Sequence, residues 1–86
     1  MPSTTVSVGS AVGLHARPAT LIAEAVTALG TPVTLVVDGG EPVDAGSALM
    51  IMTLGAEKGT SVTVSGDDQA AVDQIAGMVA KDLDAD

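Results

Sequence analysis

Hydrophobic and polar residues alternate with two different periods along the chain. Apolar side chains occupy every second position in residues 5–8, 33–37 and 61–65, which predicts strands with one buried face. Two longer segments place apolar residues at helical spacing, which predicts a helix with Pro18 in its first turn and a second helix after Asp68. The first helix has its apolar stripe at Leu21, Ile22, Ala25, Val26 and Leu29, and the last helix at Val72, Ile75, Val79 and Leu83.

Glycine and proline predict where several of these elements end. Gly9, Ser10 and Gly13 indicate a loop after the first strand, and Gly30 ends the first helix. Residues 38–40, Asp-Gly-Gly, predict a hairpin turn, with residues 41–43 as the return strand. Because proline cannot donate to a strand ladder, this return strand should be short or lie at an edge of the sheet. Residues 44–46 are expected to form a second loop.

Capping residues predict the two later helices. Ser47 is placed to cap a short helix that runs through Leu54 and stops at Gly55, with Ile51 and Leu54 in the core. The last helix is expected to take caps and first-turn negative charge from three residues, and the acidic tail, residues 82–86, is expected to fray. These three residues are Ser65, Asp67 and Asp68.

The resulting order of elements is β-α-β-β-α-β-α, which predicts an α+β fold in one domain, residues 1–86. Strands interleaved with helices and one tight hairpin favour an antiparallel or mixed sheet with the helices on one face. Inserting a later strand between the first two strands would give the split βαβ arrangement. Since the sequence contains no Phe, Tyr or Trp, the core must be aliphatic.

The formal net charge of −8, with only three basic residues, excludes several classes of partner. Nucleic acids and anionic membrane surfaces are recognised by basic patches, and single strands also by aromatic side chains, which are missing here. The absence of cysteine excludes disulfides and thiolate chemistry. Residues 1–5 do not resemble a signal peptide, and the apolar run 48–52 is too short to span a bilayer, so we expect a cytoplasmic protein.

The candidate chemistry lies in residues 13–20, Gly-Leu-His-Ala-Arg-Pro-Ala-Thr, between a strand and a helix. A helix N-terminus offers unpaired N–H groups and a partial positive charge, so it favours an anion and a neutral imidazole at His15. A neutral imidazole is a nucleophile, and the Arg17 guanidinium can contact phosphate oxygens. No second histidine, phosphate-binding loop or cluster of metal ligands accompanies them. His15 is therefore a candidate phosphoryl acceptor that depends on other proteins, although a lone histidine in a loop is more often a capping or surface residue.

This stretch resembles the active-site motif of the histidine-containing phosphocarrier (HPr) family of the bacterial phosphoenolpyruvate-dependent sugar phosphotransferase system. Residues 47–55 resemble the regulatory-serine segment of the same family, and the similarity extends over essentially the whole chain. The resemblance implies an open-faced β-sandwich, with an antiparallel sheet in the order 1-4-2-3 covered by three helices. It also implies a carrier rather than an enzyme, without cofactor or metal, acting as a monomer.

The resemblance further implies roles for individual residues. His15 would accept a phosphoryl group on Nδ1 from phosphorylated enzyme I and pass it to the A domains of sugar-specific permeases. Arg17 and the backbone N–H groups near Ala16 would hold the phosphoryl group. Ser47 would match a serine phosphorylated by a dedicated kinase in many Gram-positive relatives, although it equally fits a plain helix cap. The residues implied to contact partners are Thr20, Ala48, Leu49 and Met52.

Some positions depart from the family pattern. Many relatives carry lysines on the first helix near the active site, where this chain has Glu24 and Thr27. Gly46 precedes the serine, where a lysine is frequent, and Met50 stands where glycine or lysine is frequent. These differences leave the phosphoryl chemistry intact but bear on which kinase recognises Ser47 and on how charge contributes to partner binding.

Three other functions fit parts of the sequence. An acyl carrier would use a serine before hydrophobic residues, as in residues 46–49, but acyl carriers are all-helical. A non-catalytic binding module of the same fold would not need His15. A paralogue in a regulatory phosphorelay would share the chemistry but not the sugar substrates.

Overall fold

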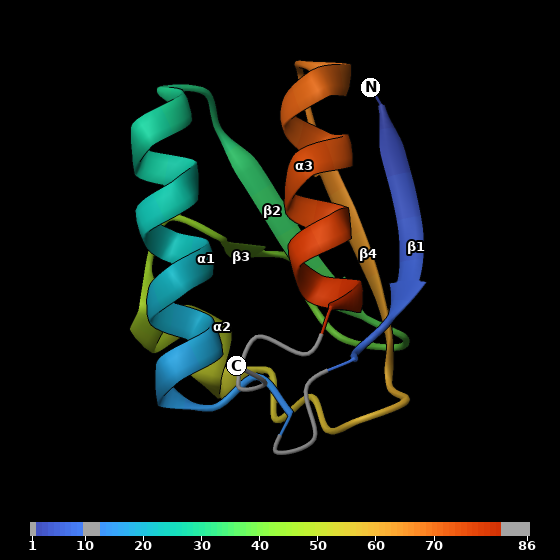
Figure 1. The fold of residues 1–86 in the computed structure, drawn as a ribbon. Coiled ribbons are helices and arrows are strands. Elements are labelled where there is room, and N and C mark those ends of the chain that lie inside the picture. The colour runs from blue at the N-terminus through green and yellow to red at the C-terminus, as the bar shows by residue number, and fades with distance from the viewer. Residues whose placement is uncertain (1, 10–12, 82–86) are drawn as a thin grey trace.

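The computed structural model describes residues 2–9 and 13–81 and has the predicted order of elements (Figure 1). The strands and helices follow one another along the chain in the order β-α-β-β-α-β-α. Their bounds are β1 Ser3–Ser7, α1 Ala16–Leu29, β2 Val33–Val37, β3 Val43–Asp44, α2 Ala48–Thr53, β4 Ser61–Gly66 and α3 Gln69–Ala80.

The four strands form one antiparallel sheet in the order β1-β4-β2-β3. β4 lies between β1 and β2, with Thr63 opposite Thr5 on one side and Val64 opposite Leu35 on the other. This arrangement confirms the open-faced sandwich and the inserted strand. Because acyl carriers are all-helical, the sheet also shows that the acyl-carrier alternative is wrong.

The core lies between the helices and one face of the sheet (Figure 1). Val62, Val64 and Leu35 are completely buried on this face, and Ile22 of α1 and Ile75 of α3 are buried against it. The opposite face carries hydroxyl side chains, and the Oγ1 atoms of Thr5 and Thr63 are hydrogen-bonded at 2.8 Å across β1 and β4. Burial by aliphatic side chains alone agrees with the absence of aromatic residues.

Three strands have different bounds from those predicted, and for β4 the difference is one added residue, Gly66. The first strand covers Ser3–Ser7 instead of residues 5–8, because its ladder with β4 starts earlier, at the pair Ser3 and Ser65. The return strand of the hairpin is Val43–Asp44 instead of residues 41–43, so Asp44 is a strand residue and not part of the loop. Pro42 has no N–H to donate, and pairing with β2 therefore begins only at Val43. The strand is short and lies at the edge, as predicted.

The first helix matches its prediction, whereas the helix capped by Ser47 ends one residue earlier than predicted. The first helix begins at Ala16, with Pro18 in its first turn and Gly30 as its C-cap at φ 69°. The helix capped by Ser47 ends at Thr53, with Leu54 as its C-cap.

The caps predicted for the last helix are only partly right. Asp68 caps α3, since its Oδ1 accepts a hydrogen bond from the N–H of Ala70 at 3.0 Å. Ser65 belongs to β4, and no acidic residue lies in the first turn of α3. Ser10, Leu83 and the tail 82–86 lie outside the described residues. Among the helices within residues 2–9 and 13–81, none has both the length and the apolar character that a membrane span requires.

Candidate functional site

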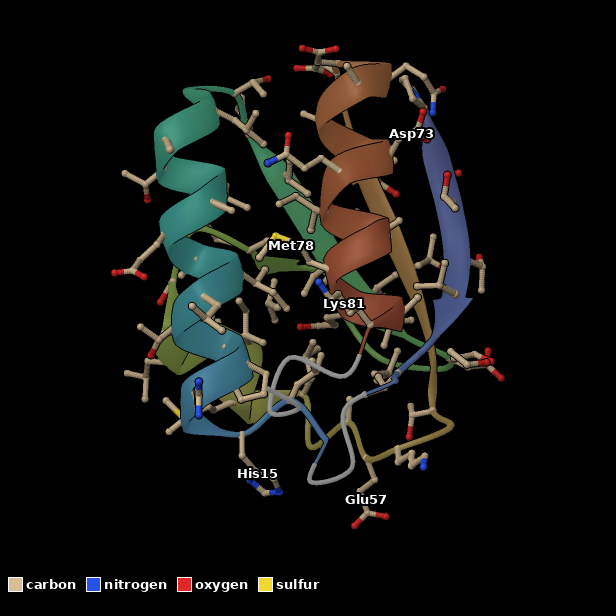
Figure 2. All side chains as sticks on the ribbon, viewed as in Figure 1. His15, Glu57, Asp73, Met78 and Lys81 are labelled. Atoms are coloured by element: carbon tan, nitrogen blue, oxygen red, sulfur yellow. The ribbon has the colours of Figure 1, made fainter. Side chains whose placement is uncertain are left out.

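His15 is the N-cap residue of α1, with extended backbone angles of φ −82° and ψ −165°. Its carbonyl oxygen accepts the first helical hydrogen bond, from the N–H of Ala19 at 2.9 Å. Its side chain makes no capping hydrogen bond and is exposed. Figure 2 shows the imidazole projecting from the end of the molecule at which α1 begins. The ring is therefore open to a partner protein.

The residues before His15 are fixed to a distant loop. Leu14 is 3% exposed, and its N–H donates to the carbonyl oxygen of Ala56 at 2.9 Å. Gly13 has φ +76°, and a Cβ atom there would lie 2.4 Å from the same oxygen. Only glycine fits both this close approach and the left-handed backbone conformation. The loop after α2 thus supports the base of the candidate site, and Glu57 projects from this same end of the molecule (Figure 2).

The first turn of α1 leaves two backbone donors for an anion. The first N–H groups of a helix have no intrahelical acceptor, and Pro18 has no N–H at all. The side chain of His15 accepts no hydrogen bond from the N–H groups of the first turn, which include those of Ala16 and Arg17. Arg17 is exposed and adds a permanent positive charge beside them. The arrangement suits a dianionic phosphoryl group bonded to the neighbouring imidazole.

Ser47 caps α2, as the sequence predicts. Its Oγ accepts a hydrogen bond from the N–H of Met50 at 3.3 Å, and its carbonyl oxygen accepts one from Ile51 at 3.0 Å. Ser47 is half-buried. α2 packs against α1, and Figure 1 shows it behind the half of α1 that begins at the His15 end. The fold therefore brings the two sequence motifs onto neighbouring helices.

α2 exposes large apolar side chains beside the site. Leu49 is 69% exposed, Met50 41% and Met52 38%, whereas Ile51 is completely buried. The expected exposed patch is therefore present. Leu54, expected in the core, is only partly buried.

The candidate site residues fall into two groups in the structure. His15, Ala16 and Arg17 lie together at the N-terminus of α1, and all three are exposed. The proposed contact residues differ in exposure. Thr20, Leu49 and Met52 are exposed, whereas Ala48 is half-buried against the core. Within the described part of the chain, no group of three or more His, Cys, Asp or Glu side chains could hold a metal ion.

Two features of the site do not follow from the local sequence pattern. Gly13 and Ala56 are far apart in the sequence, so no local sequence pattern predicts the close approach between them. Met50 belongs to the exposed apolar patch but was considered only as a departure from the family pattern. Its position one residue before the buried Ile51, on a six-residue helix, is the signal that would have placed it on the outer face.

Comparison with known proteins identifies the family. Residues 2–81 match the family model described as the PTS HPr component phosphorylation site, where PTS denotes the phosphotransferase system. The chain belongs to the HPr family. It is 43% identical over 82 residues to the phosphocarrier protein HPr of Streptomyces coelicolor, an alignment that covers 92% of this chain and 88% of that protein. This family consists of phosphocarriers of the phosphotransferase system, which confirms the resemblance drawn from residues 13–20 and 47–55.

Solved structures of HPr proteins share the fold. The HPr of Thermoanaerobacter tengcongensis is 25% identical, with a TM-score of 0.87 over 100% of this chain and 99% of that one. The HPr of Bacillus anthracis is 27% identical, with a TM-score of 0.83 over 91% and 95% of the two chains. The Bacillus subtilis catabolite repression protein Crh, described as a domain-swapped dimer, is 31% identical with a TM-score of 0.63 over 92% and 93%.

Proposed function

We propose that His15 accepts a phosphoryl group from phosphorylated enzyme I and passes it to the A domains of sugar-specific permeases. In this way the chain would couple phosphoenolpyruvate to sugar uptake in the cytoplasm. The observation that carries the proposal is the exposed imidazole of His15, which caps no N–H group, directly before the N–H groups of Ala16 and Arg17. Membership of the HPr family supports the same route.

The chemistry follows from this arrangement. The lone pair of Nδ1 of a neutral His15 attacks phosphorus, and the bond between phosphorus and the donor breaks as the new P–N bond forms. The donor leaves with the electron pair. The N–H groups of Ala16 and Arg17 and the guanidinium of Arg17 stabilise the phosphoryl oxygens. Phosphoryl transfer depends mainly on such positioning and charge stabilisation, so few other groups are needed.

In the second transfer the phosphoryl group leaves His15 for the acceptor protein, at the same site. The acceptor on the permease domain attacks phosphorus, the P–N bond to His15 breaks, and the imidazole regains its lone pair. The chain is modified and then regenerated by its partners, so it acts as a carrier and not as an enzyme with its own turnover. An exposed ring at the end of the molecule suits two successive partners, since each must approach the same atom.

The partner surface includes exposed residues of both helices. Thr20 of α1 and Leu49 and Met52 of α2 are exposed, and Ala48 is half-buried against the core. Met50 extends this patch. Exposed apolar side chains next to a reactive group are typical of a protein-binding surface.

Ser47 is a candidate site of regulatory phosphorylation by a serine kinase, reversed by a phosphatase. Phosphorylation would add about −1.5 to −2 charges at the start of α2, where the helix end tolerates negative charge. The same charge would lie beside Leu49 and Met50 on the partner surface. Modification of Ser47 would therefore alter partner binding without removing the capping oxygen.

A regulatory phosphorelay is the second candidate function. The similarity to Crh favours it, because this protein of the same fold is named for catabolite repression. Both candidates use His15 as acceptor in the first step and differ only in the protein that receives the phosphoryl group.

Intact-mass measurement tests the proposal. The chain is incubated with phosphoenolpyruvate and enzyme I, and then with a permease A domain. We expect a gain of one phosphoryl group that mild acid removes, its absence in His15→Ala, and its loss to the A domain. No gain in the wild-type chain would contradict phosphoryl transfer and favour a binding module. A gain without transfer to any A domain would favour the regulatory relay.

A further inference from the structure

A groove of about 420 Å³ lies beside the candidate site, between α1 and the segment that leads into α2. Its lining is mostly apolar, because alanine and threonine methyl groups form much of it. The lining of the groove includes Thr20, Glu24, Thr27 and Ala28 of α1, with Gly46 and Ala48 on the other wall.

One charged side chain lines this groove. Glu24 is exposed and lies in the middle of the α1 wall. Asp44 adds a second carboxylate at the opposite wall, since its Oδ1 accepts a hydrogen bond from the N–H of Gly46 at 2.8 Å. No lysine or arginine of the described chain lines the groove. Its electrostatic character is therefore negative.

The groove continues the surface that begins at His15. Arg17, Thr20 and Glu24 are exposed and follow one another at spacings of three and four residues, so they lie on one side of α1. Arg17 and Glu24 are separated by two turns, about 10 Å along the helix axis. On the other wall Ala48 is followed directly by the exposed Leu49. The surface therefore carries the positive charge of Arg17 close to His15 and the negative charge of Glu24 two turns farther along α1.

We infer that the groove binds an apolar side chain and an adjacent lysine or arginine of the protein that exchanges the phosphoryl group with His15. This inference rests on the proposed function. A bound partner would exclude water from Glu24, and a carboxylate that loses its hydration is stabilised only by a cation or by hydrogen-bond donors. Complementary charge is the arrangement that fixes orientation and speeds association. The net charge of −8 would steer a basic surface of the partner toward this chain.

Charge reversal at Glu24 tests the inference. Glu24→Lys and Glu41→Lys change the net charge equally, but Glu41 is exposed ahead of β3 and does not line the groove. The rate of phosphorylation by the cognate enzyme I is measured against the concentration of each variant, at low and at high salt. We expect Glu24→Lys to raise KM about tenfold at low salt and to leave kcat nearly unchanged. At high salt the increase in KM should be smaller, because salt screens the interaction between charges. Glu41→Lys should change KM by less than about twofold.

The neutral variant Glu24→Gln should fall between the wild type and Glu24→Lys, since it removes the attraction without adding repulsion. Circular dichroism spectra and melting curves establish that each variant is folded. Equal KM values for Glu24→Lys and Glu41→Lys would overturn the inference, and so would a lower KM for Glu24→Lys, which would show an acidic partner surface. A wild-type chain that gains no phosphoryl group would overturn the proposed function itself, and the inference with it.

Discussion

The N–H of Leu14 donates to the carbonyl oxygen of Ala56 at 2.9 Å, and both residues are almost completely buried. This hydrogen bond joins the residue before His15 to the loop that follows α2. Since the buried side chain of Leu14 and this bond act on the same residue, the backbone that enters the N-terminus of α1 has little freedom. The position of the His15 ring therefore depends on a segment far away in the sequence.

Substitution of Gly13 by alanine should disturb this support. The new Cβ would lie 2.4 Å from the oxygen of Ala56, and alanine would also have to adopt φ +76°. We expect Gly13→Ala to lower the free energy of unfolding by about 2–3 kcal/mol, through overpacking and backbone strain together. Phosphorylation of His15 by enzyme I should also slow, because the loop has to move. Urea denaturation followed by far-UV circular dichroism measures the first effect, since the chain has no aromatic residue for fluorescence.

Gly39→Ala is the matched control for this prediction. Gly39 has a similar φ of +80° in the β2–β3 hairpin, but a Cβ atom there would meet nothing within 4 Å. We expect it to cost about 1 kcal/mol, from backbone strain alone, and to leave phosphorylation unchanged. Equal losses of stability in the two variants would show that the contact with Ala56 is unimportant.

Ser47→Ala should remove the cap of α2 without affecting the chemistry at His15. The Oγ of Ser47 accepts from the N–H of Met50, and loss of such a cap typically costs about 1 kcal/mol. Ser61→Ala provides the comparison, because Ser61 is an exposed strand residue, and we expect it to change stability by less than about 0.5 kcal/mol. The rate of phosphorylation by enzyme I should be the same in both variants. If Ser47→Ala slows it strongly, Ser47 contributes to the transfer site.

The order of elements was predictable because each element has a clear local signal. The alternation in residues 61–65 and the apolar spacing at Ile22, Val26, Ile75 and Val79 required only the sequence. The bounds of β1 and β3 were not predictable, since they depend on the partner strand. β3 begins at Val43 because that residue pairs with Leu35, and β1 begins at Ser3 because that residue pairs with Ser65.

The candidate site also has parts that the sequence predicts and parts that it does not. The motif around His15 and Arg17 and the cap at Ser47 are contiguous in sequence, so they could be recognised directly. The bond from Leu14 to Ala56 and the groove between Glu24 and Ala48 are formed by residues far apart in the chain. Ser65 fits both the strand over residues 61–65 and a cap for the last helix, because serine is acceptable in either place, and the structure shows only the strand position.

Arg17→Ala should slow phosphoryl transfer without unfolding the protein. The guanidinium is exposed at the N-terminus of α1, so its removal leaves the core intact, and stability should change by less than about 0.5 kcal/mol. We expect the rate of phosphorylation of His15 to fall about 10- to 100-fold, because a charged donor to the phosphoryl oxygens is lost. Arg17→Lys should show a smaller loss, as lysine keeps the charge but not the planar fork. Rapid-quench measurement with phosphorylated enzyme I gives these rates.

Lys58→Ala removes the same unit of charge from an exposed turn and controls for the change in net charge. Its rate should stay within about twofold of the wild type, because exposed charges outside the contact surface have little effect. A similar loss in Lys58→Ala and Arg17→Ala would assign the effect to overall charge instead of to the site.

The two faces of α2 should respond in opposite ways to truncation. Ile51 is completely buried, and Ile51→Ala should lower the free energy of unfolding by about 3 kcal/mol, from lost burial and the cavity left behind. Leu49 is 69% exposed, so Leu49→Ala should cost less than about 0.5 kcal/mol but raise the KM of enzyme I for the chain, because an apolar contact with the partner is lost. Chemical denaturation and phosphorylation kinetics on both variants separate the two effects. An unchanged KM in Leu49→Ala would remove this side chain from the partner surface and leave α2 with a structural role alone.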